Sequence, residues 1–262
     1  MIRVENLSFS YGKNRILNDI SFHVDPGEYI CILGANGCGK TTLLKTMLGF
    51  LKPEQGAVTL YGENIHRMDE QEMAKKVAYI PQSHNPPFPF TVMDVVLMGR
   101  TPHLSRTYRP TAEDVSIARE AMSRLGVLKY ARKKYTELSG GQRQMVIIAR
   151  ALTQQPDILI MDEPTASLDF GNQYTVLAHM LSLARDGMSI LMVTHNPDHA
   201  LYCADRVIAM QDGKIINLGQ AKQVMNEPTM QSIYDMVIKI RDVNISANSN
   251  ATVCIPVPEI VH

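Results

Sequence analysis

Two stretches of the sequence place glycines directly before a helix-like run, where they could bind phosphate. The first, GANGCGKTT, fits the pattern G-x-x-x-x-G-K-[ST] over residues 34–41, between a strand-like run and a helix-like run. In this pattern backbone N–H groups bind phosphate oxygens, Lys40 reaches the β- and γ-phosphates, and the Thr41 hydroxyl binds Mg²⁺. The alternative is a glycine turn with a chance lysine, which the flanking elements disfavour. The residues expected to bind a nucleotide here are Gly34, Asn36, Gly37, Cys38, Gly39, Lys40, Thr41 and Thr42.

The second stretch is LSGGQ at residues 138–142, which precedes the helix-like run GQRQMVIIARAL and contains no lysine. A helix N-terminus can bind an anion through its backbone N–H groups alone, and Gly140 and Gly141 allow a close approach of the backbone. The first stretch does not explain why one chain needs a second helix start of this kind.

A pair of carboxylates follows the apolar run of ILIMDEP. The apolar residues predict a buried strand that places Asp162 and Glu163 at its carboxyl end, beside the first glycine-rich loop. Asp162 would bind the metal ion or its water, and Glu163 would act as general base on a water that attacks the γ-phosphate. Two carboxylates that only cap a strand end are the alternative, which the upstream loop disfavours.

These motifs together resemble those of the ATP-binding cassette (ABC) ATPases, and the resemblance covers nearly the whole chain. LSGGQ is the family signature without a mismatch. The resemblance implies ATP and Mg²⁺ as cofactors, Tyr11 as the aromatic that stacks on adenine, and Gln82 as the sensor of the γ-phosphate. It also implies that Asp169, in a loop crossing between subunits, takes part in binding the nucleotide, and that His195 is the switch histidine. The implied catalytic residues are Glu163, His195, Gln82 and Lys40, and the implied metal ligands are Thr41, Gln82 and Asp162.

The same resemblance answers the question raised by the second helix start. In family members two chains pack head to tail, and the signature loop of one chain closes over the γ-phosphate bound by the other. Ser139, Gly140, Gly141 and Gln142 would then bind the nucleotide held by a second copy. One chain alone would hold half of each active site.

Two departures from the family pattern lie in the first loop. Ala35 stands where proline is common, and Cys38 stands where serine is common. A thiol at a helix N-terminus tends to have a lowered pKa. We therefore expect N-ethylmaleimide to inactivate the ATPase and MgATP to protect it.

A different pattern, His195 and His199 in HNPDH, could be misread as a metal pair, but Pro197 between them predicts a helix start.

Composition narrows the class of protein. Lys+Arg and Asp+Glu are equal at 26 each among 262 residues, so no general attraction to nucleic acid is expected. The four cysteines lack CxxC spacing, the N-terminus does not resemble a signal peptide, and no apolar run reaches the length of a membrane span. These observations predict a soluble cytoplasmic protein, and the resemblance to the ABC ATPases implies that it reaches the cytoplasmic face of the membrane through permease subunits.

The pattern of elements predicts an α/β fold. We expect a P-loop NTPase core with a mainly parallel sheet, an N-terminal antiparallel β subdomain and an inserted α-helical subdomain, within a single ABC ATPase domain over residues 1–262. The core and β subdomain would comprise residues 1–83 and 156–235, the helical signature subdomain residues 84–155, and the tail at residues 236–262 a β-hairpin. Thr111 with Asp114 predicts a capping box, and Asp212 with Gly213 predicts a hairpin turn.

The segment after Gln82, residues 83–104, is rich in proline and apolar residues. It could simply pack as a small helix, or it could form the docking groove for a membrane subunit, as the family places it. With VAYIPQ and HALYCADRVIAMQDGKI, it is similar to family members that import iron–siderophores, haem, cobalamin, molybdate or tungstate. That similarity implies two transmembrane permease subunits and, indirectly, an external substrate-binding protein, with no nucleic acid.

Other classes of protein fit the sequence less well. A soluble ABC ATPase for DNA repair, translation or iron–sulfur assembly is the main rival, but such proteins often fuse two cassettes or carry a long coiled-coil insertion, and this sequence shows neither. An exporter is a further alternative, but exporters often fuse the cassette to membrane helices, and this sequence has no run of that kind. A P-loop kinase or GTPase would leave LSGGQ unexplained.

Overall fold

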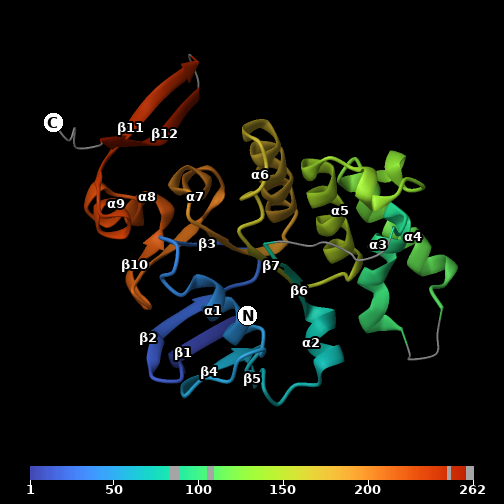
Figure 1. Cartoon of the computed structure of the whole chain (residues 1–262), viewed down its shortest axis with the longest axis horizontal. Coiled ribbons are helices and arrows are strands. Elements are labelled where there is room, and N and C mark those ends of the chain that lie inside the picture. Colours follow the sequence, from blue (N-terminus) through green and yellow to red (C-terminus); the bar gives the residue numbers. More distant parts are fainter. Residues whose placement is uncertain (83–88, 105–108, 247–248, 258–262) are drawn as a thin grey trace. The chain divides into compact units, whose positions relative to one another are not determined.

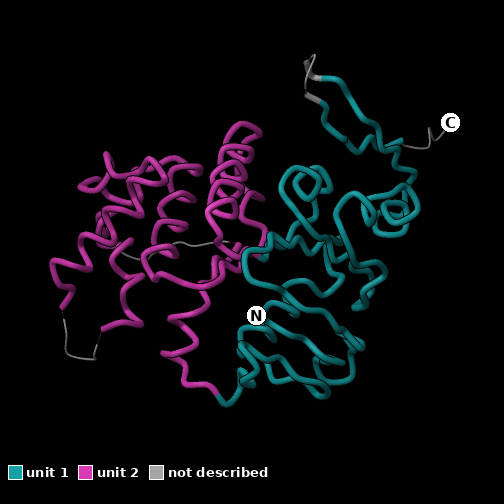
Figure 2. The backbone as a smooth tube through the Cα atoms, turned by 180° about the vertical axis from the view of Figure 1, so that it is seen from behind, with its two compact units in different colours: residues 1–67, 191–262 teal, residues 68–190 magenta. Residues whose placement is uncertain are grey.

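The computed structural model describes residues 1–82, 89–104, 109–246 and 249–257. The chain forms two compact units, shown in different colours in Figure 2: unit 1 comprises Met1–Arg67 and Leu191–His262, and unit 2 comprises Met68–Ile190. The subdomain ranges expected from the sequence have different boundaries from those of these two units, and they stay a prediction. Residues 83–88 of the expected docking segment lie outside the described residues.

The N-terminal part of unit 1 is an antiparallel sheet with the strand order β2-β1-β4-β5. β1 and β2 join through a two-residue turn at Gly12 and Lys13, and alternate residues of β1 such as Ile2 and Val4 are buried. The antiparallel sheet expected near the N-terminus is therefore present. Its strands are β1 (Ile2–Tyr11), β2 (Asn14–Val24), β4 (Gln55–Leu60) and β5 (Glu63–Asn64).

A second sheet in unit 1 has the strand order β10-β9-β3-β8. β3 is buried at every residue and runs parallel to β9, with Gly34 opposite Met210. β9 joins the antiparallel β10 through Asp212 and Gly213, both at positive φ, so the predicted hairpin turn is confirmed. The strands are β3 (Tyr29–Gly34), β8 (Ser189–Thr194, in unit 1 from Leu191), β9 (Arg206–Gln211) and β10 (Lys214–Gln220).

Short helices and a terminal hairpin complete unit 1. α7 begins at Pro197 behind the N-cap Asn196, which confirms the predicted helix start. Beyond α9, β11 and β12 pair antiparallel where the sequence predicted a hairpin, and Figure 1 shows this pair above α9. The elements are α1 (Lys40–Met47), α7 (Pro197–Cys203), α8 (Ala221–Val224), α9 (Glu227–Tyr234), β11 (Val237–Ser246) and β12 (Ser249–Val257).

Unit 2 combines a parallel strand pair with helices. Capping boxes start α3, α4 and α5, and the one at Thr111 and Asp114 was predicted. Residues at helical spacing in α5, such as Met145 and Ile148, are buried. The elements are α2 (Glu70–Lys76), β6 (Val77–Ile80), α3 (Val92–Leu97), the 3₁₀ helix η1 (Met98–His103), α4 (Ala112–Arg124), η2 (Leu128–Tyr130), η3 (Tyr135–Glu137), α5 (Gly140–Thr153), β7 (Ile158–Asp162) and α6 (Phe170–Arg185).

No helix in the described part of the chain has both the length and the apolar character needed to cross a membrane.

Candidate active site

The loop between β3 and α1 carries the first glycine-rich motif, and two glycines shape its backbone. Gly37 and Gly39 have φ values of 84° and 105°, in the left-handed region that other residues rarely adopt. A Cβ on Gly39 would lie 3.0 Å from the carbonyl oxygen of Ile16, whereas a Cβ on Gly37 would meet nothing within 4 Å. The loop therefore packs on β2 at Gly39 and leaves its backbone accessible at Gly37.

Lys40 is the first residue of α1, and its side chain folds back over this loop. Its Nζ donates hydrogen bonds to the carbonyl oxygens of Gly34 at 2.8 Å and Ala35 at 2.9 Å, and the residue is only 5% exposed. The first turn of α1 has no acidic residue. A cation within a ring of backbone at a helix N-terminus fits the negative charge of a polyphosphate. The other expected ligands vary in burial: Asn36 and Thr41 are exposed and Thr42 is half-buried.

The turn between β9 and β10 contacts the same loop. The N–H of Gly213 donates to the carbonyl oxygen of Cys38 at 3.0 Å, and a Cβ on Gly213 would overlap the carbonyl of Ile16. At the other end of the loop, a Cβ on Gly34 would lie 2.6 Å from both Cys38 Sγ and the carbonyl oxygen of Met210. The motif is thus packed against its own sheet at both ends, which fixes the loop before any ligand binds.

Cys38 does not have the environment that its position at a helix N-terminus suggested. The residue is 7% exposed, and burial raises the pKa of its thiol, although Lys40 acts in the opposite direction. The expectation of a lowered pKa is therefore wrong, because the loss of hydration outweighs the nearby positive charge.

Two further residues expected in the site also belong to unit 1. Tyr11 is 50% exposed at the end of β1, and its ring meets Phe9 edge-on at 4.9 Å between centroids. His195 follows β8, the neighbour of β3 in the sheet, and is exposed. Among the described residues, no group of three His, Cys, Asp or Glu side chains could hold a metal ion.

The carboxylates of unit 2 lie at the end of β7, as predicted. Asp162 is 3% exposed, and Glu163 follows it with φ 48°. β6 and β7 are parallel with Ile80 opposite Met161, so Gln82 follows β6 at the same edge, and its Nε2 donates to Glu163 Oε2 at 3.3 Å. The structure therefore brings two of the expected catalytic residues into contact.

The chemistry at this edge suits Mg²⁺. Asp162 and Gln82 supply a carboxylate and an amide oxygen, which are the hard donors that Mg²⁺ prefers. Burial raises the pKa of the neighbouring Tyr79 to about 12, and the charge of Asp162 adds to this effect.

The second glycine-rich motif starts α5. Ser139 Oγ accepts from the N–H of Gln142 at 3.4 Å, and the N–H of Ser139 donates to Gln142 Oε1 at 3.1 Å. A Cβ on Gly141 would lie 2.5 Å from Asn172 Oδ1, and Asn172 donates through Nδ2 to Asp169 at 2.6 Å. The signature loop and the loop of Asp169 therefore lie side by side within unit 2, with Asp169 as the N-cap of α6.

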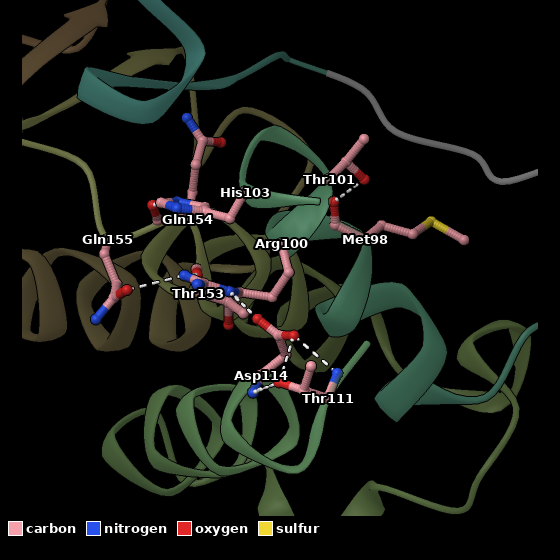
Figure 3. A network of polar contacts seen from close by, with 9 residues as sticks. All are labelled: Met98, Arg100, Thr101, His103, Thr111, Asp114, Thr153, Gln154 and Gln155. Atoms are coloured by element: carbon pink, nitrogen blue, oxygen red, sulfur yellow. Dashed lines mark hydrogen bonds and ion pairs between the residues drawn. The ribbon is translucent and has the colours of Figure 1, made fainter. Parts of the chain in front are cut away.

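A buried polar network, which the sequence did not reveal, holds α5 at its other end (Figure 3). Arg100 in η1 donates through Nε to Asp114 Oδ1 at 2.8 Å, and through Nη1 to the carbonyl of Thr153 at 3.1 Å and to Gln155 Oε1 at 2.8 Å. A Cβ on Gly99 would overlap the carbonyl of Arg150, so only glycine lets η1 come this close to α5. In the sequence, the adjacent Gly99 and Arg100 were the only sign of this network that could have been noticed. The residues that Arg100 contacts lie far along the chain, so the sequence did not identify them.

The same network reaches the strand that precedes Gln82. His103 Nε2 lies 2.8 Å from the carbonyl oxygen of Gln154, which can only accept, so this nitrogen carries the proton. Gln154 Nε2 donates in turn to the carbonyl of Ala74 and, at 2.8 Å, to that of Val77 at the start of β6. The signature helix and the strand leading to Gln82 are therefore joined by direct hydrogen bonds.

Known proteins are similar to this chain in sequence and in fold. A family model described as ABC transporter matches residues 17–166. The iron(3+)-hydroxamate import ATP-binding protein FhuC of Bacillus subtilis (strain 168) is 37% identical over 91% of this chain and 89% of its own length. A solved structure assigned to a metal-chelate type ABC transporter, in an inward-facing conformation, has a TM-score of 0.88 at 29% identity and covers 98% of this chain and 97% of that chain. The dimeric ATP-binding cassette MJ0796, bound to ADP and phosphate after hydrolysis, has a TM-score of 0.71 at 27% identity and covers 84% of this chain and 99% of that chain. The structural matches confirm the predicted α/β fold class.

Proposed function

Since the chain belongs to the ABC transporter family and is an ATPase, we propose that it powers an importer for a metal chelate (an iron–siderophore, haem or cobalamin) or for molybdate or tungstate. The observation that carries the nucleotide chemistry is the loop of residues 34–41. In that loop the Lys40 ammonium is bound by two backbone carbonyls and lies beside glycines at positive φ.

The proposed mechanism assigns the steps to residues already described. Backbone N–H groups of the loop and Lys40 bind the phosphates, and Tyr11 stacks on adenine. Thr41, Gln82 and Asp162 would hold Mg²⁺, which supplies positive charge to the phosphate oxygens. Glu163 accepts the proton of the attacking water, with His195 assisting. The contact between Gln82 and Glu163 supports this assignment, because it joins the γ-phosphate sensor to the general base.

The position of the signature motif supports a dimer. Ser139, Gly140, Gly141 and Gln142 start a helix of 14 residues without a lysine, so they can bind an anion whose cations come from elsewhere. We infer that they close over the nucleotide of a second copy packed head to tail. The dimeric state of the relative bound to ADP and phosphate supports this inference.

The importer assignment rests on the named relatives and on the segment from α3 to η1. FhuC acts in iron(3+)-hydroxamate import, and the structural neighbour is of the metal-chelate type. In this chain η1 is bonded to α5 and, through Gln154, to β6, so a permease subunit that moved η1 would move both elements. An external binding protein would deliver the substrate. A soluble ABC ATPase without a membrane partner is less well supported, because the named relatives include import and transporter proteins.

The first test replaces the general base. Glu163→Gln should reduce the steady-state rate of ATP hydrolysis by about a hundredfold or more, while the full chain still binds MgATP. It should also accumulate as an ATP-bound dimer on size-exclusion chromatography, because hydrolysis no longer opens it. Lys40→Ala is the matched control and should lose the nucleotide and the dimer together. A Glu163→Gln variant that stays monomeric in MgATP and hydrolyses it normally contradicts the mechanism.

The second test concerns the membrane partner. The tagged chain, purified with detergent from its own host, would be examined by native mass spectrometry. Two copies bound to two copies of a strongly apolar subunit would support the importer, and the co-purified subunit would narrow the substrate. A dimer without a membrane partner would move the chain to the soluble class of ABC ATPases.

A further inference from the structure

The C-terminal segment of unit 1 contacts the loop that carries His195. This loop connects β8 to α7, and the carbonyl oxygen of His195 accepts a hydrogen bond from the Tyr234 hydroxyl at 2.6 Å. Tyr234 is the last residue of α9 and lies 39 residues further along the chain. The contact joins the C-terminal helix to the backbone of the residue that we expect to assist Glu163.

A second contact comes from β12. The N–H of Cys254 donates to Asp198 Oδ1 at 2.9 Å, and Asp198 lies in the first turn of α7. The N–H of Asp198 donates to the side chain of Asn196 at 2.9 Å, and the N–H of Asn196 donates to Thr194 Oγ1 at 3.0 Å. The short loop is therefore fixed by its own helix cap and, from outside, by the tail.

The hairpin is itself held to α9 by charge. Glu227, the first residue of α9, accepts hydrogen bonds from Lys239 at 2.8 Å and from Arg241 at 3.0 Å, both on β11. These bonds lower the pKa of Glu227, so it stays a carboxylate at neutral pH. α9, β11 and β12 therefore act as one attached element that contacts the His195 loop at two points.

The surroundings of Tyr234 favour its role as a donor. Burial raises the pKa of its hydroxyl well above the usual range, and Cys254, Cys38 and Asp198 add to this effect. The group therefore stays protonated at physiological pH. Tyr234 therefore lies near Cys254 of the tail, Asp198 of α7 and Cys38 of the glycine-rich loop.

We propose that the tail from α9 to β12 positions the His195 loop for hydrolysis, with Tyr234 as the positioning residue. This inference rests on the proposed function of His195. Fixing the carbonyl of His195 fixes the backbone from which its exposed imidazole projects, so the imidazole is aligned before the reaction begins. A tail that only covers apolar surface would stabilise the fold without affecting the chemical step.

The test uses the full chain with Tyr234→Phe, which removes the hydroxyl and leaves the ring to pack. We expect kcat for ATP hydrolysis to fall about three- to tenfold, the effect of losing one hydrogen bond, with KM for ATP unchanged within about twofold. Thr252→Val is the matched control. It removes a 2.6 Å hydrogen bond to Asp242 inside the same hairpin and leaves the His195 loop untouched, so kcat should match wild type.

A double-mutant cycle decides whether Tyr234 acts through His195. In a His195→Ala background, single-turnover hydrolysis of radiolabelled ATP should not change further when Tyr234→Phe is added. An equal loss in both backgrounds, or a wild-type kcat in Tyr234→Phe alone, overturns the proposal. Failure of the proposed function gives a different result, because Glu163→Gln and His195→Ala would then hydrolyse ATP like wild type and remove the premise.

Discussion

Cys38 shows how the surroundings of one side chain decide its chemistry. Its position before α1 and its nearness to Lys40 favour the thiolate, but the thiol lies against the backbone of Gly34 and has lost most of its hydration. Burial is the larger effect, so the pKa is raised. Position at a helix start predicts reactivity only where the sulfur remains accessible.

Labelling with N-ethylmaleimide tests this correction. Because the reactive form is the thiolate and the pKa of Cys38 is raised, we expect slow modification of Cys38 at pH 7 in the native chain and rapid modification after unfolding in guanidinium chloride. Peptide mass spectrometry at timed intervals measures both rates. ATPase activity should survive the native treatment, and Cys38→Ser should retain activity. Rapid inactivation that MgATP prevents, and that is absent in Cys38→Ser, would restore the original expectation.

At the scale of the elements, the short helix η1 connects two longer helices, α4 and α5, through a buried ion pair. Its Arg100 is buried with Asp114, and the carboxylate of Asp114 also accepts from the N–H and hydroxyl of Thr111 at the start of α4. The backbone hydrogen bond from Thr111 and the bond from Arg100 lower the pKa of Asp114 from 3.8 to about 2. One short element therefore joins α4 to the carboxyl end of the signature helix (Figure 3).

The pH dependence of stability tests this ion pair. A carboxyl group with a lowered pKa in the folded state contributes stability above its unfolded pKa near 3.8, and that contribution is lost as pH falls toward about 2. At pH 6, Asp114→Asn should reduce the free energy of unfolding by about 3–5 kcal/mol, because Arg100 remains buried without its counter-charge. The difference from wild type, measured by urea unfolding, should shrink between pH 4 and pH 2. Asp186→Asn, which removes an exposed partner of Arg124, is the control and should give a small difference. A pH-independent gap for Asp114→Asn would contradict the assignment.

The sequence predicted those features that depend on neighbouring residues. The capping box of Thr111, the turn at Asp212 and Gly213, and the carboxylates at the end of β7 all follow from local patterns. The contacts of Arg100 with Thr153 and of Tyr234 with His195 span 53 and 39 residues, and depend on how helices pack. No periodicity or spacing specifies such a pair, and the burial of Cys38 escaped prediction for the same reason.

At the scale of the whole molecule, the main feature is that the two glycine-rich motifs differ in what they can supply to a nucleotide. One motif has Lys40 and lies in unit 1, and the other has the capped start of α5 and lies in unit 2. On the proposed function, each motif acts on a different nucleotide, and a second copy supplies the missing half.

Mixing two defective chains tests this arrangement. In a Glu163→Gln background, Lys40→Ala removes the cation of the loop, and Gly140→Asp places a negative charge at the start of α5. A Cβ on Gly140 would lie 3.6 Å from Leu168, an ordinary contact, so the new side chain should act by charge rather than by overlap. Each variant alone should give no ATP-bound dimer, whereas the mixture should give a heterodimer with one ATP, counted by native mass spectrometry with one chain mass-tagged. Gly140→Ala is the control and should still give a dimer with two ATP molecules. An ATP-bound dimer formed by Gly140→Asp alone would show that the signature loop is not needed across the interface.

Gly99 and Arg100 carry a constraint that reaches beyond this one chain. A side chain at position 99 would meet the carbonyl of Arg150 and push η1 away from α5, and Arg100 would then no longer reach the carbonyl of Thr153. Arg100 can therefore make this contact only while position 99 is glycine. Among descendants of this protein, a change at Gly99 therefore removes the structural reason for keeping Arg100. We expect substitutions of Arg100 to follow the loss of Gly99.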